Sequence, residues 1–124
     1  MEHLLTLFKV ASDETRLRIL MALNVRPLCV CEMTSLFNES QPKISKHLSK
    51  LRDLNLVLTQ REDKYMVYAL NQTHPVLLDF LVLTKEHMVK DSHLWQDQQQ
   101  LTTPELWACI GVDRVQEPSL EVTE

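Results

Sequence analysis

Residues 40–54 read SQPKISKHLSKLRDL, and this stretch decides the fold that the sequence predicts. The pattern predicts a helix that Ser40 caps, with Pro42 tolerated in its first turn. One stripe of this helix is apolar, formed by Ile44, Leu48, Leu51 and Leu54. A different face is basic, formed by Lys43, Lys46 and Lys50. A helix that buries one side and presents lysines on another is typical of the DNA-reading helix of a helix-turn-helix protein.

The next residues predict a β-hairpin. Residues 57–61 and 65–70 alternate apolar and polar side chains, which is typical of strands, and residues 62–64 join them. Asn55 is expected to end the preceding helix in the left-handed conformation that Asn tolerates. Helices followed by a two-stranded hairpin form a winged helix-turn-helix. The predicted fold class is therefore mainly α with a small β-hairpin.

Other helices are expected on both sides of this core. The apolar residues 2–11 predict a first helix, Ser12 is expected to cap a second, and a short third helix is expected over about 29–37. Pro75 is expected to open a long helix that runs to about Gln100. The first helix and this long helix are more apolar than one small domain can bury. We therefore expect a homodimer that forms through these two helices.

Length and charge favour one domain with a tail. The 124 residues are expected to form a winged helix-turn-helix domain for DNA binding and dimerisation over 1–101, followed by a short helix at 103–110 and an acidic tail in 102–124. The net charge is −4, but residues 40–64 hold six bases and three acids, whereas residues 91–124 hold seven acids and one base. Contact with phosphate needs a local basic face rather than a basic total.

No secretory signal is visible at the start, and the apolar run at 76–83 is broken by Asp79 and is too short to span a bilayer. We therefore expect a cytoplasmic protein that does not bind membranes. Its three cysteines, Cys29, Cys31 and Cys109, are then expected to be reduced, which favours a ligand or sensor role over a disulfide.

Three segments resemble a known family. Residues 12–20 (SDETRLRIL), 28–32 (LCVCE) and 40–48 (SQPKISKHL) are similar, in this order, to the ArsR/SmtB family of metal-responsive repressors, and the resemblance covers roughly residues 4–80. Within it, the cysteine pair resembles the arsenic-responsive (ArsR) branch. The resemblance implies a homodimer that binds an inverted repeat in double-stranded operator DNA and leaves it when metal binds.

Two positions depart from the family pattern. The arsenic-responsive branch often has a third cysteine three positions after the second, and here that position is Thr34. The branch that senses zinc, cobalt or nickel carries an Asp-x-His motif and a later histidine. Asp91 and His93 begin this motif, but the later position is Pro104. We therefore expect that second type of site to be absent.

The expected inducer is trivalent arsenic or antimony, because these ions are soft and thiolates suit soft ions. The expected ligands are Cys29 and Cys31. Residues two apart on an intact helix do not face each other, so both sulfurs reach one ion only if the first turn distorts. The alternative is that both cysteines are small apolar residues that fill a core. Cys109 is either a third ligand, from the same or the opposite subunit, or a buried helix cysteine.

The basic helix and the hairpin supply the expected DNA contacts. Gln41, Ser45 and Lys46 are expected to reach base edges from the first half of the helix. The expected phosphate contacts are Ser40, Lys43, Lys50, Arg61 and Lys64. His47 fits either a phosphate contact or a packed histidine. Glu62 and Asp63 repel phosphate, so deep insertion of the hairpin tip into a groove is not expected.

The sequence holds no glycine-rich phosphate loop and no recognisable pairing of a nucleophile with a base, so an enzyme is not expected, nor is an organic cofactor. The predicted function is that of a metalloid-responsive transcriptional repressor. Three alternatives remain open at this point. They are a cadmium- or lead-responsive repressor, a repressor that responds to thiol oxidation or persulfides, and a dimerising module that has lost DNA binding.

Overall fold

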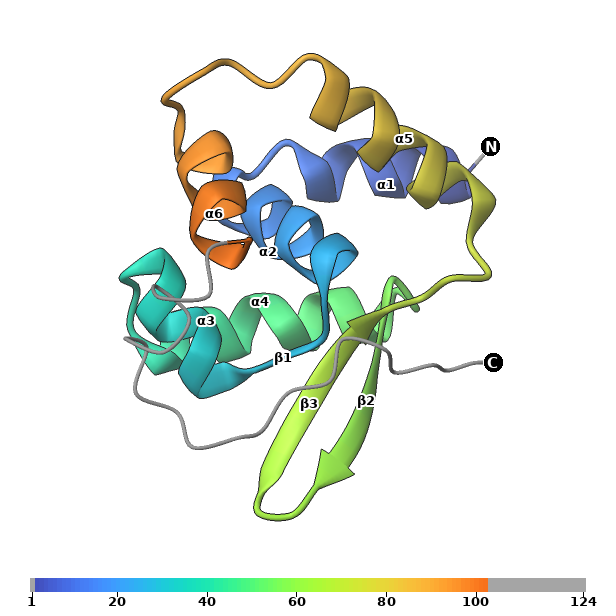
Figure 1. The fold of residues 1–124 in the computed structure, drawn as a ribbon. Coiled ribbons are helices and arrows are strands. Elements are labelled where there is room, and N and C mark those ends of the chain that lie inside the picture. Colours follow the sequence, from blue (N-terminus) through green and yellow to red (C-terminus); the bar gives the residue numbers. More distant parts are fainter. Residues whose placement is uncertain (1, 103–124) are drawn as a thin grey trace.

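The computed structural model describes residues 2–102, which form six helices and three strands (Figure 1). In chain order they are α1 (Glu2–Ala11), α2 (Glu14–Val25), β1 (Leu28–Cys29), α3 (Val30–Phe37), α4 (Gln41–Asp53), β2 (Val57–Glu62), β3 (Tyr65–Leu70), α5 (Pro75–Glu86) and α6 (His93–Leu101). Within residues 2–102, no helix is both long enough and apolar enough to span a bilayer.

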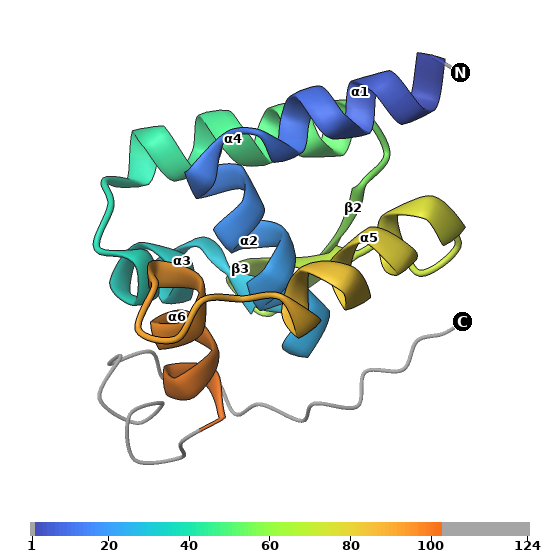
Figure 2. The ribbon, with the colours of Figure 1, turned by 90° about the horizontal axis from the view of Figure 1, so that it is seen from above.

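Helix α2 lies in the middle of the molecule, with the other helices around it (Figure 2). Its residues Ile19–Leu23 are buried, and the core that they share includes the apolar stripe predicted for α4, namely Ile44, Leu48 and Leu51. Burial of one such side chain stabilises a fold by about 1.5–3 kcal/mol. The apolar stripe of α4 therefore fixes which face of that helix remains outside.

The predicted start of α2 is wrong by one residue. Asp13, not Ser12, is the N-cap, and its Oδ1 accepts a hydrogen bond from the backbone N–H of Arg16 at 3.1 Å. The Ser12 hydroxyl instead donates to the carbonyl oxygen of Lys9 at 2.7 Å, at the end of α1. Both residues can cap a helix. In the structure Asp13 has the extended conformation that a cap needs, with φ −93° and ψ 126°.

The predicted hairpin is confirmed and extends outward from the helices (Figure 1). Strands β2 and β3 pair antiparallel from Val57 with Leu70 to Glu62 with Tyr65. Asp63 turns the chain with a φ of 58°, a conformation that Asp tolerates without a glycine. The sequence did not predict β1, which pairs with β3 and gives the sheet the order β1-β3-β2. Two residues are too few to show an alternation.

The predicted long helix over 75–100 is wrong, because the structure has two helices there. Helix α5 ends at Glu86, and α6 begins at His93. Between them Asp91 has a φ of 69°, and the Ser92 side chain accepts from the backbone N–H of Trp95 at 3.2 Å. This cap competes with continuation of the helix. The apolar residues continue across the break because both helices pack against the same core.

An ion pair holds α6 against α2. The Arg18 guanidinium donates twice to the Asp97 carboxylate, at 2.8 and 2.9 Å, and its side chain also lies over the ring of Phe37 at the end of α3. Burial raises the pKa of Asp97, and the bond to Arg18 partly offsets this. Gln98 adds a hydrogen bond to the carbonyl oxygen of Met21. The C-terminal helix is thus part of the folded body and does not continue α5.

Candidate thiol site and nucleic-acid interface

The two neighbouring cysteines differ completely in exposure. Cys29 ends β1 and is the N-cap of α3, and only 1% of it is exposed. Cys31, in the first turn of α3, is exposed. The first turn is intact, which agrees with the expectation that residues two apart do not face each other. Among the described residues, no group of three or more His, Cys, Asp or Glu is placed to hold a metal ion.

A capping box fixes Cys29 at the start of α3. The carboxylate of Glu32 accepts from the backbone N–H of Cys29 at 2.9 Å, and the Cys29 side chain faces the backbone N–H of Glu32. The role of Glu32 was not predicted from the sequence, although a Glu three residues after the cap is a known signal. The signal was weak here because the cap is a cysteine instead of Ser or Thr.

Cys29 also belongs to the sheet. In the register of β1 with β3, Leu28 lies opposite Tyr68 and Cys29 lies opposite Val67. Val67 in turn lies opposite Gln60 in β2. Helix α3 packs against α4. A movement of Cys29 would therefore reach both the hairpin, through the sheet, and α4, through α3.

Helix α4 and the hairpin carry the residues that were expected to contact DNA. Ser40 caps it as predicted, and its hydroxyl oxygen accepts from the backbone N–H of Lys43. The expected contacts that lie exposed are Ser40, Gln41, Lys43, Lys46, Lys50, Arg61 and Lys64, and Ser45 is partly exposed. The Lys43 ammonium pairs with Glu39 at 3.1 Å. Exposed lysines also occur on ordinary solvated helices, so contact with DNA stays a prediction.

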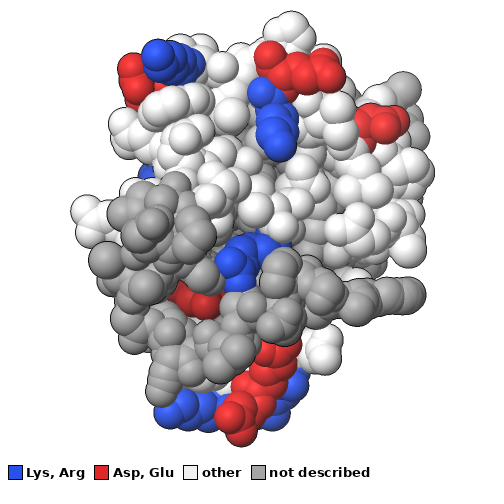
Figure 3. Space-filling view, viewed as in Figure 1, with Lys and Arg blue, Asp and Glu red and all other residues white. Residues whose placement is uncertain are grey.

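The tip of the hairpin carries both signs of charge. Figure 3 shows Lys and Arg beside Asp and Glu at the bottom of the view, where the hairpin ends. Arg61 and Lys64 are exposed there, and Asp63 lies between them in sequence. The tip therefore has little net positive charge to attract phosphate, in line with the expectation of shallow contact.

His47 is packed and does not share the exposure of the lysines on α4. It is 8% exposed, and its Nδ1 accepts a hydrogen bond from Nε of Arg16 at 3.1 Å. Burial and the bond to Arg16 favour the packed role of the two left open for it, and the phosphate contact stays a prediction. Burial lowers the pKa of His47, and the positive charges of Arg16, Lys43 and Lys46 lower it further, against an opposing effect of Asp13.

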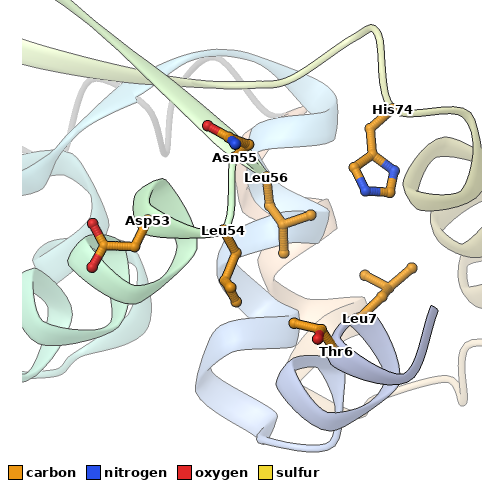
Figure 4. Close-up of a pocket in the computed structure, with 7 residues that line it drawn as sticks. All are labelled: Thr6, Leu7, Asp53, Leu54, Asn55, Leu56 and His74. Carbon is orange, nitrogen blue, oxygen red and sulfur yellow. The ribbon is translucent and has the colours of Figure 1, made fainter. Parts of the chain in front are cut away.

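A shallow hollow of about 270 Å³ lies elsewhere, between α1, the end of α4 and the segment before α5 (Figure 4). Its lining includes Thr6, Leu7, Leu56 and His74. His74 caps α5, because its Nδ1 accepts from the backbone N–H of Leu77. The described residues that line this hollow include no cysteine and no expected DNA contact, so it is not part of the candidate site.

Helices α1 and α5 carry large exposed apolar side chains. In α1 these are Leu5 and Phe8, and in α5 they are Val76, Val82 and Leu83. The rings of Phe8 and Phe80 lie 6.5 Å apart, so the two helices meet there. Cys109 and the short helix expected at 103–110 lie outside the described residues.

Comparison with known proteins identifies the family. Residues 13–59 match the profile described as "Bacterial regulatory protein, arsR family". The arsenical resistance operon repressor of Staphylococcus aureus is 38% identical over 80 residues, which cover 64% of this chain and 75% of that protein. The chain belongs to the arsR family. The family is one of regulatory proteins and this relative is an operon repressor, in agreement with the regulator that the sequence predicts.

Other relatives agree on the family. The arsenic resistance transcriptional regulator ArsR2 of Pseudomonas putida is 45% identical over 69 residues, covering 55% of this chain and 60% of that protein. A cadmium resistance transcriptional regulatory protein CadC homolog of Staphylococcus aureus is 34% identical over 68 residues, covering 54% of this chain and 56% of that protein. The match thus spans little more than half the length of these two relatives.

Solved structures agree on the fold. The reduced form of HlyU from Vibrio cholerae superimposes with a TM-score of 0.63 and is 28% identical, covering 72% of this chain and 92% of that one. The winged helix-turn-helix architecture predicted from residues 40–70 is therefore confirmed.

The packing of His47 predicts how stability depends on pH. Its pKa in the folded protein lies below the value of about 6.5 in the unfolded chain. As the pH falls from about 7.5 through 6.5 toward the lower folded pKa, the unfolded state binds more protons, so the free energy of unfolding decreases. His47→Gln keeps an acceptor for Arg16 but does not titrate, so urea unfolding at pH 7.5 and 5.5 should show a smaller decrease. His87→Gln, at an exposed histidine, is the matched control. An undiminished pH dependence in His47→Gln would contradict this origin.

Proposed function

We propose that this protein is a metalloid-responsive repressor that binds operator DNA as a homodimer and is released when trivalent arsenic or antimony binds Cys29 and Cys31. The observation that carries the proposal is the position of Cys29. This one residue ends β1, caps α3 and pairs with the hairpin strand β3. A ligand at its sulfur would thus act on the hairpin through β3 and on α4 through α3, and these are the two elements expected to touch DNA.

For DNA binding, α4 is the proposed reading helix. Its buried stripe holds it against α2, and its exposed Gln41 and Lys46 point away from the core, with Ser45 partly exposed beside them. Gln side chains pair with adenine edges and Lys with guanine edges in the major groove. Lys50 and the hairpin's Arg61 supply phosphate contacts. A dimer with twofold symmetry would present two such helices, which fits an inverted repeat.

The proposed dimer forms through α1 and α5. Phe8 is 52% exposed and Val82 is 55% exposed, and such large apolar groups on adjoining helices favour association. From the sequence, the helix expected at the dimer interface starts at Pro75 and runs to about Gln100. Since α5 ends at Glu86, the proposed interface uses α5 and not α6.

Release follows from the geometry of the first turn of α3. Cys31 is exposed whereas Cys29 is buried, so one ion reaches both sulfurs only if Cys29 turns outward. That movement breaks the hydrogen bond between Cys29 and Glu32 and loosens the pairing of Cys29 with Val67. The start of α3 then unwinds, and both α4 and the hairpin lose a fixed support. Cys109, a small thiol or water would complete the site, since trivalent arsenic prefers three ligands.

A second candidate is release by another thiol-directed signal. Cadmium and lead also suit thiolates, and one relative is named for cadmium resistance. The structural relative HlyU was solved in a form named reduced, which favours a response to thiol oxidation or persulfides. Protein mass after treatment with oxidant and with arsenite distinguishes a response to oxidation from a response to a metalloid. An oxidised thiol and a bound metalloid change the mass by different amounts.

If Cys29 and Cys31 are the ligands, replacing either one should abolish the release of DNA by arsenite. Cys29→Ser and Cys31→Ser should bind operator DNA as the wild type does, because serine keeps the size, but arsenite should not release them, because serine offers no thiolate. A DNA shift assay titrated with arsenite measures this. Cys109→Ser is the comparison, and it should weaken the response only if Cys109 is the third ligand. Release of Cys29→Ser and Cys31→Ser at the wild-type arsenite concentration would place the site elsewhere.

If α4 is the reading helix, substitutions on it should weaken DNA binding in two different ways. Gln41→Ala and Lys46→Ala should each weaken operator binding by about 1–3 kcal/mol and lower the ratio of operator to random-DNA affinity. Lys50→Ala should weaken both DNAs alike and reduce the salt slope by about 1. Competition binding at several salt concentrations separates the two patterns. The assignment of α4 fails if neither Gln41→Ala nor Lys46→Ala changes the affinity ratio.

The apolar surface predicts the oligomeric state. The wild type should sediment as a dimer at micromolar concentration, and Val82→Asp should shift it toward monomer, because a carboxylate would be buried at the interface. Leu58→Asp places the same charge on the exposed hairpin and should leave the dimer intact. A wild-type protein that sediments only as monomer contradicts the dimer.

A further inference from the structure

Glu32 is a buried carboxylate to which the proposed release mechanism gives no task of its own. It lies in the first turn of α3 and is 3% exposed. Carboxylates are almost never fully buried unless their oxygens are hydrogen bonded. Its Oε1 accepts from the backbone N–H of Cys29 at 2.9 Å. The buried charge is therefore directed at the residue that has to move for both thiols to reach one ion.

The contact fixes Cys29 from the side of α3. With φ −93° and ψ 169°, Cys29 is extended, so it continues β1 and caps α3 at the same time. On its other side it pairs with Val67 of β3. Glu32 thus helps to hold Cys29 in place, and because this contact is made by a side chain, a substitution can remove it.

This support opposes ligand binding. Cys29 has to leave its buried position to share an ion with the exposed Cys31, and its backbone N–H then moves away from Glu32. A hydrogen bond to an ionised group is roughly twice as strong as a neutral one. The stronger this bond, the more inducer is needed before Cys29 turns outward.

We propose that Glu32 is a positioning residue that keeps the thiol site closed and sets the inducer concentration at which Cys29 is released. The inference rests on the proposed function for its physiological meaning, but the closed state of Cys29 can be measured without any inducer. A glutamine at this position would keep an oxygen acceptor and lose the charge. An alanine would lose both.

The first experiment measures the access of reagent to Cys29. In the 124-residue chain with Cys31→Ser and Cys109→Ser, iodoacetamide can alkylate only Cys29, because the chain has three cysteines. Adding Glu32→Ala should speed the reaction by about 2-fold to 30-fold, the range that loss of a helix cap corresponds to. Glu32→Gln should lie between Glu32→Ala and the parent. Asp13→Ala removes the cap of α2 instead and should leave the rate unchanged.

The second experiment measures arsenite release of DNA in proteins that keep all three cysteines. Glu32→Ala should need less arsenite for half-release by a similar factor, and Glu32→Gln should need an intermediate amount. Unchanged alkylation rates in both variants overturn the proposal. The proposal is also overturned if Asp13→Ala accelerates alkylation of Cys29 as much as Glu32→Ala does. General loosening of the fold would then explain the result.

The two hypotheses fail separately. If arsenite does not release the wild type but Glu32→Ala still exposes Cys29, the positioning role stands and the proposed inducer is wrong. If arsenite releases the wild type and both Glu32 variants at one concentration, the inducer stands and the positioning role is wrong. Should Glu32→Ala not fold, as circular dichroism would show, Glu32→Gln decides: alkylation faster than in the parent supports the proposal, and an equal rate overturns it.

Discussion

Burial of α2 is the constraint on which the rest of the structure depends. This helix contacts α1, α4, α5, α6 and β3, and its residues Ile19–Leu23 are buried. A helix surrounded in this way leaves its neighbours few positions, because protein interiors are close-packed. The orientation of α4, and with it the set of exposed lysines, follows from the fit of Ile44, Leu48 and Leu51 against this central helix.

The candidate thiol site lies at the junction of two short elements. Strand β1 has two residues, and α3 has eight. Their junction at Cys29 depends on the Glu32 carboxylate and on the pairing with β3. The buried thiol thus lies at a junction that connects to the hairpin through β3 and to α4 through α3, the two elements expected to meet DNA.

Patterns within one element could be predicted, and contacts between elements could not. The cap at Ser40, the left-handed Asn55 and the two hairpin strands depend on local backbone chemistry, and all were predicted. The break between α5 and α6 was missed, because apolar spacing continues across it and only the cap at Ser92 ends the pattern. The pairing of β1 with β3 joins residues almost 40 positions apart, which no local pattern reveals.

The sequence by itself determined the winged helix-turn-helix fold, the basic face of α4 and the presence of two thiols at the start of α3, because periodicity, caps and residue types are local properties. Only the tertiary structure decided that Cys29 is buried while Cys31 is exposed, that His47 packs against Arg16, and that Glu32 is bonded to Cys29. Burial depends on which surfaces meet when the chain folds. Residues of the same chemical type therefore have different roles, because their neighbours in space differ.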